Sequence, residues 1–328
     1  MTDLAVDSSS PLADAPRGSS DGRGPAAART LRGNWLGRWA LANLAAQVGI
    51  VVTGGLVRVT GSGLGCPTWP ECFDGSLTPP RHAATGSHAA VEFGNRMLTF
   101  VLTAVAVALV VTVVRQRRRS AAIRADRRLL VLALVPFLGI VAQAVLGGVT
   151  VLVDLSPAWV AAHLLLSMVL ISASTWLVVH LQPRQGWAGA ARREVRIAGA
   201  CLALLTGAVL VLGTVVTGAG PHAGDELTPR YDLDIRAMTW LHADAVLVLG
   251  GLALVLMVAT RLLEAPRQAQ RWCLAVVGVC AAQSLVGYVQ YATGVPWGLV
   301  LAHLLGASLL VVAVTGALLR TWETPAAG

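Results

Sequence analysis

Residues 129–152 read LLVLALVPFLGIVAQAVLGGVTVL, an apolar run of 24 residues without Asp, Glu, Lys or Arg. A helix rises about 1.5 Å per residue, so a run of this length can cross the roughly 30 Å hydrocarbon core of a bilayer. The segment is therefore predicted to be a transmembrane helix.

Seven further segments have the same character. Of the 328 residues, 55% are hydrophobic and only 13% are charged, whereas soluble domains carry about 25% charged residues. This composition predicts an all-α integral membrane protein. The eight transmembrane helices are expected at about 38–57, 91–114, 129–152, 158–181, 196–217, 237–260, 270–292 and 297–319.

The positive charge is carried by arginine alone. The net charge is +8, but the arginines stand in short clusters between apolar runs, most densely within 115–128. That pattern marks cytoplasmic loops, so nucleic-acid binding is excluded and both termini are predicted to be cytoplasmic. Residues 1–37 are polar and are predicted to form a disordered cytoplasmic tail. The lack of lysine fits a GC-rich bacterial genome, and we expect a multi-pass protein of the bacterial plasma membrane.

Two parts of the chain repeat. The sequence VVTG occurs at 51–54 and again at 215–218. QAVLGGV from Gln143 precedes AHLL around His163, and QSLVGYV from Gln283 precedes AHLL around His303, with 20 residues from Gln to His in both cases. We therefore predict two parallel four-helix bundles, residues 38–182 and 196–320, related by an axis along the membrane normal.

Each even-numbered span carries a polar residue near its expected outer end: Glu92 with Asn95, then His163, His242 and His303. Such groups are costly in a bilayer and indicate function. Two imidazoles on neighbouring helices can hold a haem iron, so His242 and His303 are predicted to be a ligand pair. The alternative is that these histidines are hydrogen-bonded packing residues.

The first half offers Asn95 and His163 in the corresponding places, which is one strong ligand instead of two. Glu92 precedes Asn95 by three residues and Arg96 by four, so the three side chains can share a helix face. Glu92 is either a carboxylate beside a reacting centre or a helix-start carboxylate neutralised by Arg96 and the helix dipole. The other histidines are predicted to be solvated or interfacial: His82, His88, His180 and His222.

The first outer loop contains GSGLGCPTWPEC at 61–72. Two close cysteines on an oxidising face are expected to form a disulfide, here between Cys66 and Cys72. This bond could be a structural staple or a redox-active pair. The remaining cysteines lie in apolar runs and are predicted to pack as small residues: Cys201, Cys273 and Cys280.

Together these features resemble haem A synthase, the membrane enzyme of the CtaA/Cox15 type. The resemblance covers about residues 38–320. It is carried by GGLVRVTGSGLGC at 54–66, WPEC at 69–72, EFGNR at 92–96 and the three membrane histidines. It implies oxidation of a methyl group of haem O to a formyl group by successive hydroxylations, giving haem A for terminal oxidases.

The resemblance also implies roles for individual residues. His242 and His303 would ligate haem b, His163 would ligate the substrate haem, and Glu92 would act in catalysis. Much of the family has histidine where this chain has Asn95, so the substrate pocket here would offer one imidazole. Candidates for pairing with haem propionates are Arg58, Arg96 and Arg236.

Three other functions predict different sequence features. A non-catalytic di-haem cytochrome b carrying electrons predicts strong ligands in both halves. A transporter predicts charges near the membrane midplane. A haem O synthase needs paired Asp-rich motifs, whereas only Asp232 and Asp234 stand together. The partners expected are haem O, a haem O synthase and an electron acceptor.

Overall fold

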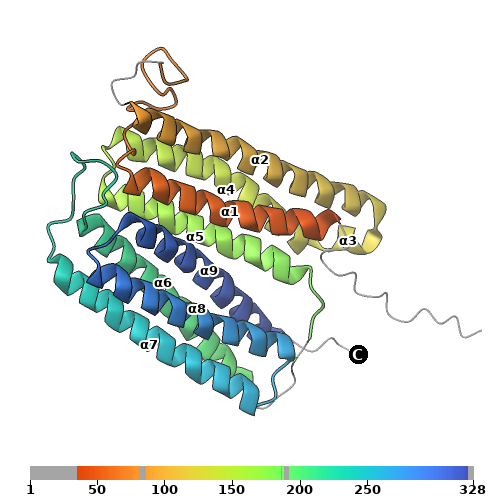
Figure 1. The fold of residues 1–328 in the computed structure, drawn as a ribbon. Helices are drawn as coiled ribbons and strands as arrows, with labels where there is room; N and C mark the ends of the chain where they lie inside the picture. The colour runs from red at the N-terminus through yellow and green to blue at the C-terminus, as the bar shows by residue number, and fades with distance from the viewer. Residues whose placement is uncertain (1–34, 81–85, 186, 188–191, 324–328) are drawn as a thin grey trace, which may run out of the picture.

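The computed structural model describes residues 35–80, 86–185, 187 and 192–323 (Figure 1). These residues form α1 (Trp35–Val59), α2 (Ser87–Arg119), α3 (Ala121–Ala125), α4 (Arg127–Leu152), α5 (Pro157–His180), α6 (Arg192–Ala219), α7 (Ile235–Leu262), α8 (Arg267–Ala292) and α9 (Trp297–Trp322). Within this described part, eight helices, all except α3, are long and apolar enough to span a membrane. The predicted all-α membrane fold is confirmed. The predicted tail lies outside the described residues, except for 35–37, which begin α1.

Most of the spanning helices begin before or end after the predicted apolar runs, because polar residues at their ends continue the hydrogen-bonded helix. α3 was not predicted from hydropathy. It begins where the Ser120 hydroxyl accepts a hydrogen bond from the Ile123 amide, and α4 begins where Asp126 accepts one from Leu129 at 3.1 Å. Such side chains satisfy amides that a helix start leaves free. Burial alone would raise the pKa of Asp126, but hydrogen bonds from His180 and Leu129 outweigh it and hold this pKa below its usual value.

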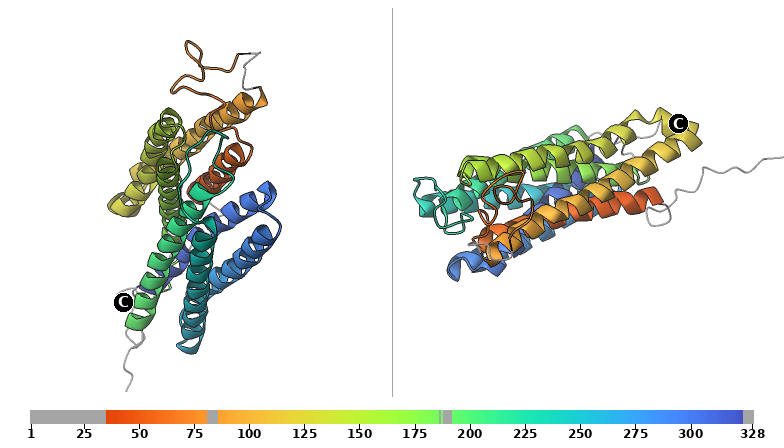
Figure 2. Two further views of the ribbon diagram at one scale, coloured as in Figure 1. Left: turned by 90° about the vertical axis from the view of Figure 1, so that its left-hand side faces the viewer. Right: turned by 90° about the horizontal axis from the view of Figure 1, so that it is seen from above.

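The spanning helices pack as two groups. In the first, α1, α2, α4 and α5 each contact two neighbours around a ring, and α6, α7, α8 and α9 do the same in the second. The groups meet through α1, α5, α6 and α9 (Figures 1 and 2). The symmetry axis proposed from the repeat stays a prediction.

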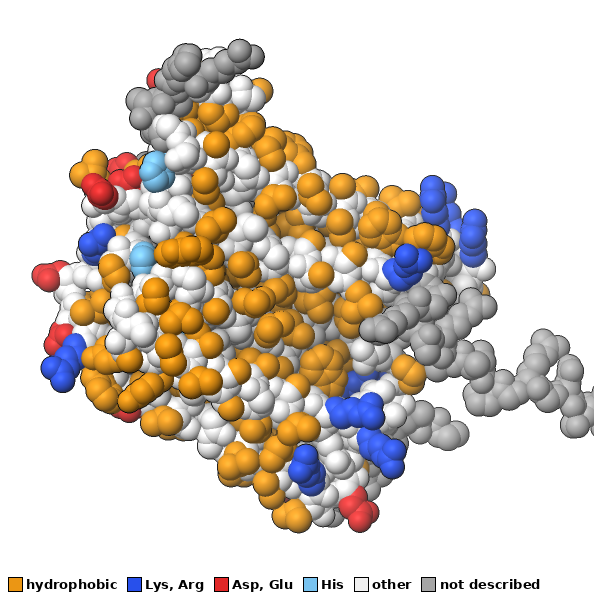
Figure 3. All heavy atoms as spheres, viewed as in Figure 1, with side chains coloured by type: hydrophobic (Ala, Val, Ile, Leu, Met, Phe, Trp, Pro, Cys, Tyr) orange, Lys and Arg blue, Asp and Glu red, His pale blue; other side chains and the backbone are white. Residues whose placement is uncertain are grey.

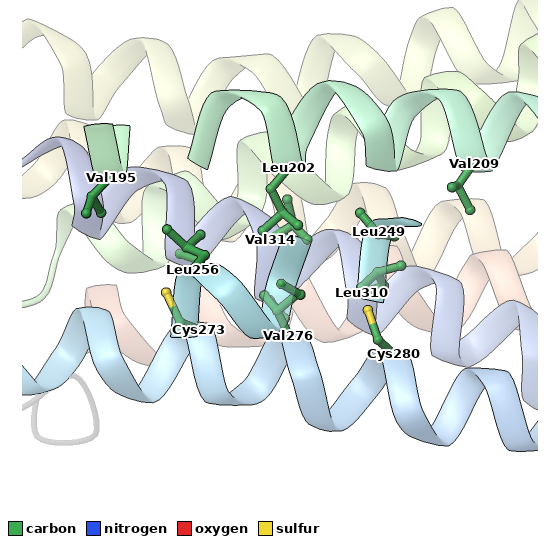
Figure 4. Close-up of a cluster of buried hydrophobic side chains, with 13 residues drawn as sticks. Val195, Leu202, Val209, Leu249, Leu256, Cys273, Val276, Cys280, Leu310 and Val314 are labelled. Atoms are coloured by element: carbon green, nitrogen blue, oxygen red, sulfur yellow. The ribbon is translucent and has the colours of Figure 1, made fainter. Parts of the chain in front are cut away.

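α2 and α7 bury the same pattern of positions. Counting from Asn95 in α2 and from His242 in α7, the positions 7, 11 and 14 residues later are buried in both helices. These residues are Leu102, Ala106 and Leu109 in α2, and Leu249, Ala253 and Leu256 in α7. Asn95 therefore stands on α2 where His242 stands on α7. The second-group side chains form a core with Leu202, Val276 and Val314 (Figure 4).

The two ends of the molecule differ in charge. Large apolar side chains cover the flank between the ends, and arginines gather mainly at one of them (Figure 3). We call this the arginine end, and the opposite end, which carries the loop with Cys66 and Cys72, the disulfide end. An apolar belt between polar ends is the surface that a bilayer requires.

Arg320 joins the two groups at the arginine end. Its side chain is only 2% exposed. It donates to Glu323 at 2.5 Å, to Gln182 Oε1 at 2.6 Å and to the Pro183 carbonyl at 3.1 Å. A buried cation of this kind is stable only with its partners, and the loss of one side of such a pair costs about 3–5 kcal/mol.

Replacing Arg320 with Met should therefore destabilise the protein, because Glu323 and Gln182 would lose their buried partner. We expect a lower thermal midpoint for the detergent-purified protein, measured by differential scanning fluorimetry. Arg261→Met is the matched control, since Arg261 is exposed at the end of α7. An unchanged midpoint for Arg320→Met would show that the hydrogen bonds of Arg320 do not hold the two helix groups together.

Candidate functional site

A cavity of about 870 Å³ extends across the two helix groups. It is lined by residues of both groups, including Glu92, Asn95, His163, His242 and His303. This volume falls within the roughly 300–1,000 Å³ typical of ligand and cofactor pockets. The sequence predicted two pockets at one depth. In the structure they are the two ends of one continuous space.

All the predicted site residues lie at the disulfide end of their helices. Glu92 lies five residues after the start of α2, His163 six after the start of α5, His242 seven after the start of α7 and His303 six after the start of α9. At about 1.5 Å per residue, they lie at similar depths, roughly 8–11 Å inside the helix ends. The polar residues therefore form a layer across both groups.

His242 and His303 face each other in the second group. Their ring centroids are 6.4 Å apart and their planes are inclined by 65°. Metal–nitrogen bonds of about 2.0–2.1 Å on opposite sides of one metal put the centres of two imidazoles roughly 6 Å apart. The spacing of these two side chains therefore fits a metal held between them.

Each membrane histidine is seated against a glycine of the preceding helix. A methyl group added to Gly147, Gly213 or Gly287 would come within 3.1–3.4 Å of Cε1 of the facing imidazole. The facing rings are those of His163, His242 and His303, in that order. A larger residue at these glycines would displace the rings, so the glycines fix where the imidazoles lie.

The hydrogen bonding of the rings leaves them available to a ligand. The Nδ1 atoms of His163 and His303 are buried without a hydrogen-bond partner among the described residues. His242 Nδ1 has only the Val209 carbonyl beside it, outside hydrogen-bonding geometry. Among the described residues, none forms a hydrogen bond with Nε2 of any of the three rings. The alternative of hydrogen-bonded packing residues requires such bonds, so the rings without protein partners support the interpretation of a ligand site.

Glu92 is held on both of its carboxylate oxygens. Oε1 accepts hydrogen bonds from Arg96, at 3.1 Å from Nε and 2.6 Å from Nη2, and Oε2 accepts one from the Cys66 amide at 2.7 Å. The side chain is buried and also lines the cavity. The two interpretations of Glu92 are therefore compatible, because the carboxylate is neutralised by Arg96 and still borders the cavity.

Arg96 ties α2 to the loop at the disulfide end. Its guanidinium donates to the carbonyls of Cys66, Thr68 and Glu71 at 3.1–3.2 Å. Cys66 and Cys72 form the predicted disulfide, and both are fully buried. The loop is thus fastened to the site by the same Glu92–Arg96 pair that borders the cavity.

Asn95 supplies an amide in place of an imidazole, and the buried oxygen of that amide, Oδ1, lacks a hydrogen-bond partner among the described residues. The other first-group histidines do not fill the place: His88 Nδ1 bonds to Ser62 Oγ at 2.9 Å, and His180 Nε2 bonds to Asp126 at 2.7 Å. His82 lies outside the described residues. Among the residues that the structure describes, His163 is the one imidazole at the first-group end of the cavity.

Arg58 connects the two helix groups, a contact that no sequence pattern indicates. Its Nε donates to the His222 carbonyl at 2.6 Å and its Nη2 to the Thr217 carbonyl at 3.1 Å. His222, expected to be solvated, lines the cavity and bonds through Nε2 to the Val295 carbonyl at 2.9 Å. Arg58 is therefore a cross-link between the groups, with its Nε and one Nη2 donor committed to these carbonyls. Arg236 is exposed at the start of α7.

Substituting Arg96 with Gln should loosen the loop while leaving the fold intact. Several charge-assisted hydrogen bonds would be lost, each worth about 1.5–3 kcal/mol. We expect at least a roughly tenfold faster reduction of the Cys66–Cys72 disulfide, because local opening would be less costly. Maleimide labelling after limited dithiothreitol treatment measures this rate. Arg236→Gln is the control, and equal rates would contradict the fastening role of Arg96.

Comparison with known proteins identifies the family of the chain. No curated protein matches the chain significantly. The model of the COX15-CtaA family, described as cytochrome oxidase assembly protein, matches residues 37–315. The matched segment includes the disulfide loop, Glu92 and the three membrane histidines. The chain therefore belongs to the COX15-CtaA family of cytochrome oxidase assembly proteins, the haem A synthase family.

Proposed function

We propose that this protein is a haem A synthase that oxidises a methyl group of haem O to a formyl group by successive hydroxylations. Membership of the family assigns it to haem A synthesis in general. The observation that carries the specific reaction is the inequality of the two cavity ends. One end has the facing pair His242 and His303, and the other has His163 with Asn95 and the fixed carboxylate of Glu92.

The second-group end is the cofactor site in this proposal. His242 and His303 would hold haem b through their Nε2 atoms, since their spacing fits one metal between two imidazoles. Haem b would supply one-electron redox chemistry and so relay electrons from the substrate to an acceptor. Gln283 steadies this site, because its Nε2 donates to the His303 carbonyl at 2.8 Å.

The first-group end is the substrate site. His163 would bind the iron of haem O from α5, and Gln143 steadies that helix by donating to the His163 carbonyl at 3.1 Å. Asn95, facing the cavity from α2, supplies no strong ligand. A substrate held by one imidazole is released more readily than a cofactor held by two, as turnover requires.

Glu92 is the catalytic residue in this proposal. Its carboxylate would stabilise positive charge developing at the substrate methyl group or accept a proton from it. Arg96 and the Cys66 amide hold both oxygens, so the carboxylate does not have to reorient during the reaction. Such preorganisation is the main way in which a fixed charge lowers a barrier.

The setting of the reaction follows from the charge distribution. The arginine end would face the cytoplasm of a bacterium, with both termini there, which places the haem layer near the outer face of the plasma membrane. Haem O would come from a haem O synthase, and an electron acceptor would receive the electrons. Arg58 and Arg236 lie at the disulfide end of the molecule, on the outer side of the membrane, where the haem propionates would lie.

A di-haem electron carrier is the alternative function. It requires strong axial ligands at both ends of the cavity. The described residues provide a second imidazole only in the second group, and they add Glu92 at the end that lacks it. These features favour chemistry over simple electron transfer.

Expression together with a source of haem O, followed by haem extraction and chromatography, tests the proposal. The wild-type protein should yield haem A and its hydroxylated intermediate. Glu92→Gln should keep the haem b absorption and reduce haem A by at least about 100-fold, which is typical of losing a general base. Glu264→Gln, an exposed change at the arginine end, is the matched control.

His303→Ala should remove the haem b absorption, which separates the cofactor site from the reacting site. A folded, haem-loaded wild-type protein that yields no haem A would contradict the enzyme assignment. Normal turnover by Glu92→Gln would reduce Glu92 to a structural partner of Arg96.

A further inference from the structure

Gln47 is a buried amide without a protein partner. It lies within α1, its residue is only 2% exposed, and it lines the cavity. Its Nε2 is buried and has no hydrogen-bond partner among the described residues. A lost hydrogen bond is costly for a buried donor, and within a membrane-spanning helix no bulk water compensates it. Gln47 therefore indicates a group that enters the cavity and accepts a hydrogen bond.

The complementary atom comes from α4. Gln143 uses its Nε2 on Ser167 Oγ at 2.6 Å and on the His163 carbonyl at 3.1 Å, but its Oε1 is buried and unpaired among the described residues. Gln143 lines the same cavity as Gln47. Among the described first-group amides that line the cavity, Gln47 thus leaves a donor unpaired, and Gln143 and Asn95 each leave an acceptor unpaired. A hydroxyl group can satisfy the donor of Gln47 and the acceptor of Gln143, because it donates one hydrogen bond and accepts others.

These amides lie deeper than the proposed iron ligand. Gln47 is twelve residues from the disulfide end of α1, or about 18 Å, whereas His163 is six residues from the corresponding end of α5, or about 9 Å. Val48 and Leu164 belong to one cluster, so this turn of α1 lies against α5 just beyond His163. The hydroxyl would therefore sit on a side chain that points from the substrate towards the membrane interior.

The second group has no such amide on α6. At the position that matches Gln47 in the VVTG repeat stands Val211, which is exposed and does not line the cavity. The α6 residues that line the cavity are Val209, Leu210, Gly213, Thr214 and Thr217. Among the described residues, an unpaired amide donor is thus found at the proposed substrate end, whereas the second-group amide Gln290, which also lines the cavity, leaves only an acceptor, Oε1, unpaired.

We propose that Gln47 and Gln143 recognise the hydroxyl group of haem O and so select haem O over haem b at the first-group end. This inference rests on the proposed function. Haem O differs from haem b in carrying a hydroxylated farnesyl side chain where haem b has a vinyl group. Haem b would leave both amides unpaired, and sites built around a substrate hydroxyl can reject the analogue that lacks it by factors of up to about 10⁴–10⁵.

The test is the haem composition of the full-length protein purified from cells that make both haem O and haem b. A His163→Ala variant defines which part of the bound haem belongs to the first-group end. Gln47→Met has a similar length but cannot donate a hydrogen bond, and it should lower the ratio of haem O to haem b at that end by at least about tenfold. The control is Gln270→Met, since the Gln270 amide bonds to the Ala265 carbonyl at the arginine end.

The haem b absorption of the second-group end reports folding in every variant. If Gln47→Met loses that absorption, Gln47→Leu carries the same comparison. An unchanged ratio in a folded variant would overturn the inference and show that the two amides hold water only. A wild-type protein with no His163-dependent haem O would instead contradict the proposed function itself.

Discussion

A polar side chain inside a bilayer persists only where protein or a cavity accommodates it, and this constraint shapes the whole molecule. Glu92 meets it by ion pairing with Arg96 and by accepting a hydrogen bond from the Cys66 amide. The membrane histidines are accommodated differently: their rings are seated against glycines, and Nδ1 of His163 and of His303 has no hydrogen-bond partner in the part of the chain that the structure describes. Polar groups that are costly and unpaired therefore converge on one cavity, and the packing of both helix groups serves to hold them there.

The two ends of that cavity share a framework and differ in chemistry. Asn95 and His242 occupy matching places on helices that bury the same positions. In the proposed function, the amide of Asn95 in place of one imidazole, with Glu92 three residues away, makes one end the reacting end and leaves the other as the cofactor-binding end. The deeper amides of Gln47 and Gln143 extend the same difference. The proposed function therefore depends on the residues that differ between the two helix groups.

The sequence predicted the spanning helices and the polar layer because both follow from local rules, namely apolar length and residue depth. It also anticipated the Cys66–Cys72 disulfide, since the two cysteines share one short loop. It could not predict that Arg96 would bind three carbonyls of that loop, or that Arg58 would reach His222, because irregular backbone is positioned by long-range contacts. The sequence does not single out Gln47, because an amide in an apolar run gives no sign of whether it faces lipid or a cavity.

The two ends of the cavity are proposed to bind iron differently, and electron paramagnetic resonance of the oxidised protein, loaded at both ends, distinguishes their iron centres. We expect one low-spin signal that His303→Ala removes, and one high-spin signal that His163→Ala removes. Asn95→His should convert the high-spin signal to a second low-spin signal by restoring a histidine pair. Two low-spin signals in the wild-type protein, or a high-spin signal that Asn95→His leaves unchanged, would contradict this proposal.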